Sequence, residues 1–444
     1  MKQIDPIARL RTSRNIHDVI RTSIVDTSPA VLLCLVVGLA LGLRVAYVIF
    51  LVPDAFPVWR DTAHYVSIAR NLLAGQGYID TVGYWANEPL YSDVGPTSHW
   101  LPLYPFFLAG MFAFFGEFPR AIFLAQALLS SLAVGAVFLS SRQLFSVRLA
   151  FLAALLQSVD LYDIYYSGFP STESFTASLL AGALLLAILC ECSYRRQGFM
   201  PWSPWIGLAI ILGVGCLHRS TFALLAVVMP TYILLTYFAK TRNVKDVLFK
   251  GATACFLLAT VISPWLIRNY SLWDRPVYES KVGINLLIGN NARATGEFDL
   301  DFVPRLDPEL YNELERDDEF RRLAWQWISN HPFDALGLFI KKNILIWNPV
   351  PRVQAGTLFW IGLTWSVVIL SLACLGILRS LWNIQRFALP LLMLVGYVFS
   401  ITVAFATTRY RIPLIPILAI FAANGISLLC SLRRTRYTHA EPAH

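Results

Sequence analysis

Charged residues are scarce in this chain. They make up 14% of its 444 residues, whereas hydrophobic residues make up 56%, and a soluble globular domain carries roughly a quarter charged residues. Cysteine is also rare, and none of the seven cysteines lies in the two long polar stretches, residues 53–100 and 268–355. The composition therefore excludes an ordinary water-soluble fold, and it predicts neither a disulfide framework nor a CxxC metal site.

The N-terminal region lacks the pattern of a cleaved signal peptide. Its basic residues are spread over a polar leader, and the first apolar run ends without an A-x-A site. A signal peptide combines a short basic region, an apolar core and small residues at the cleavage point. We therefore expect residues 1–29 to form a cytoplasmic tail.

The uncharged parts of the chain form long apolar runs. A helix needs about 20 mostly apolar residues to cross a bilayer, and such runs recur from Val31 to Cys430. The pattern predicts an all-α polytopic membrane protein of about 10 to 12 transmembrane helices. The expected spans are residues 30–52, 121–141, 149–166, 172–191, 204–217, 221–239, 249–267, 356–379, 387–407 and 412–430.

The net charge of +8 sits in short basic blocks between these runs rather than on one face, which argues against nucleic-acid binding. The positive-inside rule puts such blocks on the cytoplasmic side, and this leaves both polar stretches outside. The topology requires that the apolar run Leu101–Gly116 does not cross. We expect that run to be re-entrant or interfacial, and the alternative is an extra crossing there. The basic blocks expected on the cytoplasmic side are Arg142 with Arg148, Arg195 with Arg196, Lys240 to Lys245, Arg379 with Arg386, and Arg433 to Arg436.

This topology divides the chain into five parts. Tails at 1–29 and 431–444 flank an N-terminal transmembrane module, 30–267, which includes the outer loop 53–100. An outer region, 268–355, ends in an apolar and basic piece that suits an interfacial helix, and transmembrane helices follow at 356–430. We expect a multi-pass protein of the cell inner (plasma) membrane whose two long polar stretches face the periplasm or the cell exterior.

The first outer loop opens with a short amphipathic helical pattern. Asp61 stands at its start, apolar residues follow at helical spacing, and Gly75 ends it. A carboxylate at a helix start is either a cap for the free backbone N–H groups or a functional group. The pattern alone leaves both interpretations open.

The run from Asp61 to Tyr78, DTAHYVSIARNLLAGQGY, directly after the first span, resembles the first-loop motif of the glycosyltransferase C superfamily. The nearest branch is the bacterial relatives of protein O-mannosyltransferases and aminoarabinose transferases. Two positions depart from the family pattern: Thr62 stands where many relatives have Glu, and SHWLP at 98–102 replaces a His-Pro-Pro segment. Similar pieces occur in the right order along nearly the whole chain: PTSHWLPLYP at 96–105, Ser171 to Glu173, His218 with Arg219, PWLIRN at 264–269, GINLLIGNN at 283–291 and RYRIPLIP at 409–416.

The resemblance implies a membrane enzyme of the GT-C fold. Such an enzyme transfers a sugar from a polyprenyl-phosphate-linked donor to a glycolipid, polysaccharide or protein acceptor outside the membrane, usually with inversion. The transfer needs a base for the acceptor hydroxyl and cations for the departing phosphate. Asp61 matches the family's catalytic aspartate and is the expected general base. Glu173, at the outer start of a span, is either a second catalytic carboxylate or a partner of the helix dipole.

The remaining candidates are expected to contact substrate. Arginine suits a lipid phosphate because its charge is permanent and its donors are paired, although snorkelling to headgroups is the alternative. Asparagines suit sugar hydroxyls, and they also suit tight turns. The expected substrate-binding residues are Arg60, His64, Tyr65, His99, Arg219, Arg268, Asn285, Asn290, Arg409 and Arg411.

Four titratable residues share the first loop with Asp61, namely Asp80, Glu88, Asp93 and His99. Their spacing matches no compact ligand motif. We expect no metal site and no cofactor beyond the lipid-linked sugar as co-substrate, with a divalent metal left open.

Two other functions remain open from the sequence. Arg44, Asp160 and Asp163 lie within or beside apolar runs, as ions do along the path of a transporter or flippase. A non-catalytic assembly subunit, in which Asp61 only caps a helix, is the third interpretation. Convergence of Asp61, Glu173 and the arginines on one outer cavity is the feature that discriminates between them.

Overall fold

The computed structural model describes residues 28–56, 60–82, 94–304, 306, 311–351 and 356–438, and of residue 60 and residues 433–438 it describes the backbone alone. Most of the predicted tail 1–29 and the last part of the predicted tail 431–444 lie outside these ranges. Glu88 and Asp93 also lie outside them.

Within the described ranges, eight helical segments are long and apolar enough to cross a membrane, and three shorter apolar helices accompany them. The prediction of an all-α polytopic membrane protein is confirmed. The long segments are α2 (Pro29–Phe50), α5 (Pro119–Leu144), α8 (Glu173–Gln197), α10 (Thr221–Thr241), α11 (Val244–Trp273), α15 (Thr357–Leu381), α16 (Ile384–Thr402) and α17 (Ile415–Thr438) together with the 3-10 segment η2 (Thr408–Leu414) before it. The shorter ones are α4 (Leu103–Phe115), α6 (Val147–Ser158) and α9 (Trp202–Cys216).

One expected span has a different structure. The single helix predicted over 149–166 is wrong, because the chain there forms α6 and a second helix, α7 (Leu161–Ser167). Asp160 ends the first and caps the second, since its side chain accepts hydrogen bonds from the backbone N–H groups of Tyr162 and Asp163. A capping carboxylate supplies an acceptor to otherwise unpaired donors and so starts a new helix.

The expected non-crossing run is α4, which has 13 residues. At about 1.5 Å per residue such a helix is roughly 20 Å long, shorter than the roughly 30 Å hydrocarbon core. Gly116 ends α4 with a positive φ of 70°, a conformation that favours glycine.

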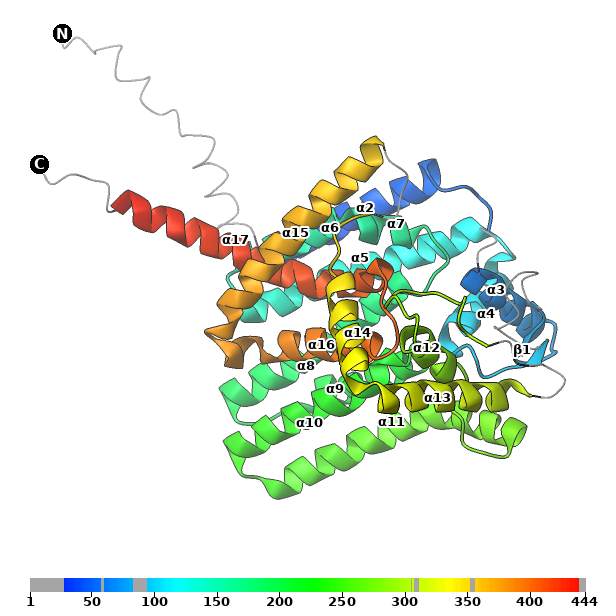
Figure 1. Ribbon diagram of the computed structural model, residues 1–444. Helices are drawn as coiled ribbons and strands as arrows, with labels where there is room; N and C mark the ends of the chain where they lie inside the picture. The colour runs from blue at the N-terminus through cyan, green and yellow to red at the C-terminus, as the bar shows by residue number, and fades with distance from the viewer. Residues whose placement is uncertain are drawn as a thin grey trace, which may run out of the picture.

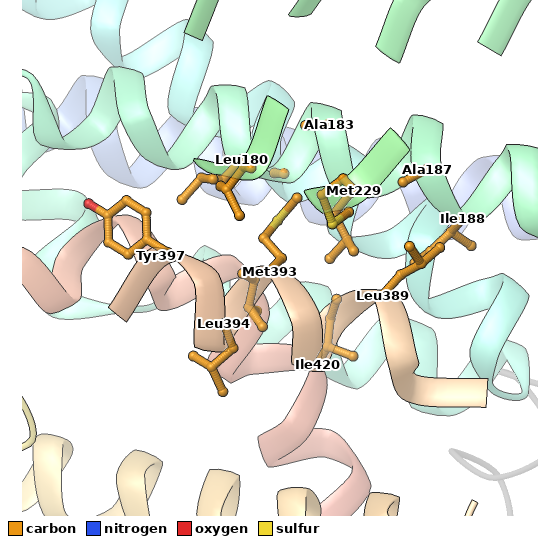
Figure 2. Packing of buried hydrophobic residues seen from close by; sticks show 14 of the residues in the cluster. Leu180, Ala183, Ala187, Ile188, Met229, Leu389, Met393, Leu394, Tyr397 and Ile420 are labelled. Atoms are coloured by element: carbon orange, nitrogen blue, oxygen red, sulfur yellow. The ribbon is translucent and has the colours of Figure 1, made fainter. Parts of the chain in front are cut away.

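The main core lies between α8, α10, α16 and α17 (Figure 2). Small residues on α8, among them Ala183 and Ala187, bring that helix close to its neighbours, and Met393 and Tyr397 of α16 fill the space between them. Helices in membranes associate through such close packing because lipid offers no hydrophobic contrast. This packing fixes the position of α8, whose first residue is Glu173.

Helices α15 and α17 pack against each other through glycine. A methyl group on Gly376 would lie 1.8 Å from the carbonyl oxygen of Phe421, and one on Gly425 would lie 2.1 Å from that of Leu372. Neither contact is possible for a larger residue without moving a helix. The two glycines therefore set the separation of these helices.

Charged side chains inside the bundle are paired with protein groups. Arg44 of α2 is fully buried and donates to Asp163 at 2.8 Å and to Ser130 at 2.8 Å. The same guanidinium also donates to three backbone carbonyl oxygens. Burying an ion is costly unless it is paired and hydrogen-bonded, and this pair meets both conditions.

The loop elements gather at one end of the bundle. Helix α3 (Arg60–Leu73), α4 and the short antiparallel strands β1 (Ile79–Asp80) and β2 (Gly95–Pro96) lie together there, while the last turns of α17 lie at the opposite end (Figure 1). The second polar stretch adds α12 (Val282–Gly289), α13 (Glu313–Asn330) and α14 (Pro332–Leu345). In Figure 1, α14 runs across the direction of the long helices.

Two side chains join the polar stretches to each other. Arg268 donates to the carbonyl oxygens of Thr97 at 2.7 Å and Tyr78 at 2.9 Å. Glu313 accepts from the Ser98 backbone N–H at 2.8 Å and from the Ser280 hydroxyl at 2.5 Å. The two polar stretches thus form one connected surface.

Candidate functional site

Three residues from distant parts of the chain meet at the loop end of the bundle: Asp61 in the first turn of α3, Glu173 at the start of α8, and Arg409 in η2. The Arg409 Nε atom donates to Glu173 Oε1 at 2.5 Å, and its Nη2 atom donates to Asp61 Oδ2 at 3.1 Å. One guanidinium therefore bridges two carboxylates. We call Asp61, Glu173, Arg409 and the neighbouring Arg219 the acid–arginine cluster.

Arg219 completes this cluster. It follows α9, and its Nη1 atom lies 3.9 Å from Glu173 Oε1. Its guanidinium also lies over the ring of Tyr410, 4.9 Å from the ring centre, a favourable cation–π arrangement. Glu173 is fully buried, so two arginines and the N-terminus of α8 stabilise its charge.

Asp61 is the most accessible carboxylate of the cluster, with its side chain 40% exposed. Its desolvation raises the pKa, but the charge and hydrogen bond of Arg409, with smaller contributions from Lys281 and His64, outweigh it and hold the pKa below its usual value. Asp61 is therefore ionised at neutral pH. An ionised carboxylate is the form that can accept a proton.

Aromatic and imidazole groups form the wall beside Asp61. His64 Nδ1 lies 2.5 Å from Asp80 Oδ2, and the His64 ring stacks on Trp100. Tyr65 packs edge-on against Trp100 and Tyr104, and its pKa is raised well above the usual range, first by burial and then by the charge of Asp61. These contacts fix the orientation of α3.

His99 packs against the same indole, with its ring edge-on to Trp100. Burial, and then the charges of Lys281, His64 and Arg316, lower its pKa well below the usual range. His99 is therefore neutral at physiological pH and adds no positive charge for a phosphate.

Of four other predicted site residues, three make their hydrogen bonds with groups outside the cluster. The Arg268 guanidinium binds loop carbonyl groups as described, and Arg411 donates to the Asn348 carbonyl oxygen at 2.8 Å. Asn290 is buried and accepts from Lys342 at 2.9 Å. Asn285 is half-buried on α12.

Arg60 begins α3. Its side chain lies outside the described atoms.

Lys281 was missed by the sequence reasoning. Its ammonium lies 4.6 Å from the centre of the Trp100 ring and 3.1 Å from Glu279 Oε1, and its charge acts on Asp61. The only signal was its place two residues before the GINLLIGNN segment. A lysine in a long polar loop carries no pattern that distinguishes it from a solvated one.

Among the described residues, no three His, Cys, Asp or Glu side chains are placed to hold a metal ion. The chemistry within reach is that of two carboxylates and two permanent cations at one end of a membrane bundle. This combination suits removal of a proton next to a departing anion.

Comparison with known proteins gives two kinds of likeness. Residues 96–267 match the family model described as dolichyl-phosphate-mannose-protein mannosyltransferase. A search of curated proteins gives no match.

Among solved structures, the apo oligosaccharyltransferase of Archaeoglobus fulgidus is similar at 13% identity with a TM-score of 0.55, covering 94% of this chain and 52% of that one. AglB from the same organism, in complex with an inhibitory peptide and a dolichol-phosphate, is similar at 15% identity with a TM-score of 0.54, covering 93% and 52%. ArnT from Cupriavidus metallidurans bound to undecaprenyl phosphate is similar at 15% identity with a TM-score of 0.39, covering 89% and 78%. The chain spans about half the length of the oligosaccharyltransferases that it matches.

The fold likeness extends over nearly the whole chain, and the family match covers the segment that contains Glu173 and Arg219. Both agree with the ordered motifs of the sequence, of which the first begins at Asp61. The chain is a multi-pass helical membrane protein that shares its fold with these oligosaccharyltransferases, and its residues 96–267 match the mannosyltransferase family model.

Proposed function

We propose that this protein transfers a sugar from a polyprenyl-phosphate-linked donor to an acceptor hydroxyl on the outer face of the membrane, with inversion at the anomeric carbon. The observation that carries the proposal is the bridge that Arg409 makes between Asp61 and Glu173. The proposed base and the proposed phosphate-binding cation are therefore in direct contact. The relative AglB, whose structure holds a dolichol-phosphate, supports a donor of this class.

Asp61 is the general base in this proposal. The acceptor oxygen attacks the anomeric carbon and forms the new glycosidic bond while its proton passes to the Asp61 carboxylate. The bond between the anomeric carbon and the donor phosphate oxygen breaks, and its electron pair leaves with the polyprenyl phosphate. Displacement in one step inverts the anomeric carbon. The partial exposure of Asp61 gives the acceptor access to the base.

Arg409 and Arg219 hold the departing phosphate. Their charges are permanent and their paired donors match phosphate oxygens. Glu173 is buried against both arginines, so its role in this proposal is to orient the two guanidinium groups. Removing one such donor typically costs about 10²–10³ in rate.

An apolar groove supports a lipid-linked donor. It has a volume of about 770 Å³ and follows α14 and the turn after it. Arg411 donates to Asn348 at the edge of this groove, two residues along the chain from Arg409. The groove is lined by Phe339, Ile340, Asn343, Ile344, Leu345, Trp347, Asn348 and Pro349.

The orientation follows from α8. This helix carries Glu173 at its first residue and Arg195 with Arg196 in its last turn. Its 25 residues span roughly 37 Å at 1.5 Å per residue, enough to cross a bilayer. The positive-inside rule puts the arginine end in the cytoplasm, so the cluster faces the periplasm or the cell exterior of an inner (plasma) membrane.

The transporter interpretation has no such support. Arg44 and Asp163 are bonded to each other and to protein groups, and Asp160 accepts from the Trp365 indole at 2.7 Å. These ions therefore have partners within the bundle.

The test is transfer of labelled sugar from membrane polyprenyl-phosphate donors, with Asp61→Asn compared with the wild type. We expect transfer to fall by at least about 10², the usual contribution of a general base. Glu117→Gln, which removes an exposed carboxylate paired with Arg70, is the matched control and should transfer normally. Equal transfer by Asp61→Asn and the wild type would remove Asp61 as the base.

A further inference from the structure

A small polar cavity lies on the outer surface, away from the apolar groove. It has a volume of about 290 Å³ and is formed by the segment after α11, the first turn of α12 and one face of α13. The lining residues that carry charge are Arg275, Glu279, Asp317, Asp318 and Arg321.

The charges of this cavity nearly balance. Arg275 pairs with Asp318 at 2.6 Å, and Arg321 pairs with Asp317 at 2.5 Å. Three carboxylates face two guanidinium groups, so an anionic ligand such as a phosphate is disfavoured. No described group of carboxylates there is arranged for a metal ion. A neutral ligand that both donates and accepts hydrogen bonds fits the cavity best.

Glu279 points to the same class of ligand. Its side chain is 1% exposed, and its Oε1 atom accepts from Lys281 at 3.1 Å. Its other oxygen, Oε2, is buried and has no hydrogen-bond partner. A buried acceptor without a donor costs about 1–3 kcal/mol, more for a charged group, and a ligand hydroxyl would remove that cost.

Lys281 links the cavity to the acid–arginine cluster. Glu279 contacts Lys281, and Lys281 lies over Trp100 and acts on the charge of Asp61. The walls of the cavity are also fixed, because Glu313 joins Ser280 to Ser98 of the first loop. A ligand held here contacts Glu279, the partner of the lysine whose charge acts on the proposed base.

We propose that this cavity binds a neutral, hydroxyl-rich saccharide unit of the acceptor, which makes the acceptor a glycan rather than a protein side chain. The proposal rests on the proposed sugar transfer. Glu279 Oε2 accepts from a ligand hydroxyl, while Arg275 and Arg321 donate to ligand oxygens. The acceptor hydroxyl that reacts belongs to a neighbouring part of the same glycan.

The first experiment measures transfer by the purified full chain as a function of acceptor concentration. Glu279→Gln should raise the KM for a glycan acceptor about tenfold, as expected for one weakened hydrogen bond to a charged group, and leave the KM for the donor unchanged. Arg275→Gln, at the half-exposed rim, is the second variant if Glu279→Gln fails to fold. Arg322→Gln is the matched control, because Arg322 pairs with Glu319 outside the cavity. An unchanged acceptor KM, or an equal rise for the donor, would overturn the proposal.

A binding experiment separates this proposal from the proposed function. Saturation-transfer NMR on the detergent-solubilised chain would use the methyl glycosides of glucose, mannose and N-acetylglucosamine, with glucosamine and glucuronic acid as charged comparators. We expect signals for neutral sugars that Glu279→Gln weakens strongly and Arg322→Gln retains. That result would support the cavity even if no donor is turned over. Binding of charged comparators alone, or of no sugar, would contradict it.

Discussion

The guanidinium of Arg409 lies 3.1 Å from the Asp61 carboxylate while its Nε atom holds Glu173. In Arg409→Lys the charge remains, but a single ammonium cannot reproduce this fork. We expect kcat/KM for sugar transfer to fall by about 10²–10³, the range for loss of one charge-stabilising donor. Arg70→Lys, a change in an exposed pair with Glu117, serves as the control. Near-normal transfer by Arg409→Lys would show that the fork is dispensable.

The pH dependence of transfer follows from the same contact. Arg409 lowers the Asp61 pKa against the effect of burial, so the base stays ionised to lower pH than an ordinary aspartate. The acid limb of kcat/KM, which reports the free enzyme, should lie below the usual aspartate range. In Arg409→Gln the lowering contribution is lost, the pKa rises, and the limb should move to higher pH. A limb that stays in place in Arg409→Gln would contradict the assignment of the base.

Stability depends on the buried pair of Arg44 and Asp163. Arg44→Met leaves a buried carboxylate without its cation, which typically costs about 3–5 kcal/mol. The double variant Arg44→Met/Asp163→Leu removes both charges and should recover much of that loss. Thermal unfolding in detergent would measure both. Equal destabilisation by the single and double variants would mean that packing, rather than charge, dominates at this site.

The contact between α15 and α17 is equally specific. Gly376→Ala would put a methyl group 1.8 Å from the Phe421 carbonyl oxygen, so we expect a loss of about 1–3 kcal/mol through overpacking. Gly38→Ala, in α2, meets nothing within 4 Å and should be neutral or slightly stabilising, since alanine favours a helix. Melting temperatures of the two variants provide the comparison. A Gly376→Ala protein that melts with the wild type would refute this packing.

The sequence predicted the class of fold because apolar runs report directly on membrane helices. It missed the break at Asp160, although a carboxylate followed three residues later by Asp163 is a helix-start signal. The helix-start signal was present, but the length of the apolar run led to the prediction of one continuous span. A hydropathy average conceals a single capping residue.

The site was predictable only in part. Asp61, Glu173 and Arg409 were named from ordered motifs, but their meeting was not, since the bonded pairs are separated by 236 and 348 positions. The contacts of Arg268 with loop carbonyls and the place of Lys281 beside Trp100 depend on how two polar loops fold together. The hydrophobic periodicity of the sequence carries no information about such contacts.

The wide spacing of the cluster along the chain bears on the biogenesis of the protein. A membrane protein is synthesised from its N-terminus, so Asp61 and Glu173 are made long before Arg409, which stands just before the last helix, α17. Until Arg409 is in place, Asp61 lacks the partner that contributes most to lowering its pKa, and Glu173 lacks its closer arginine. A chain truncated before residue 409 therefore has most of its helices and no assembled cluster.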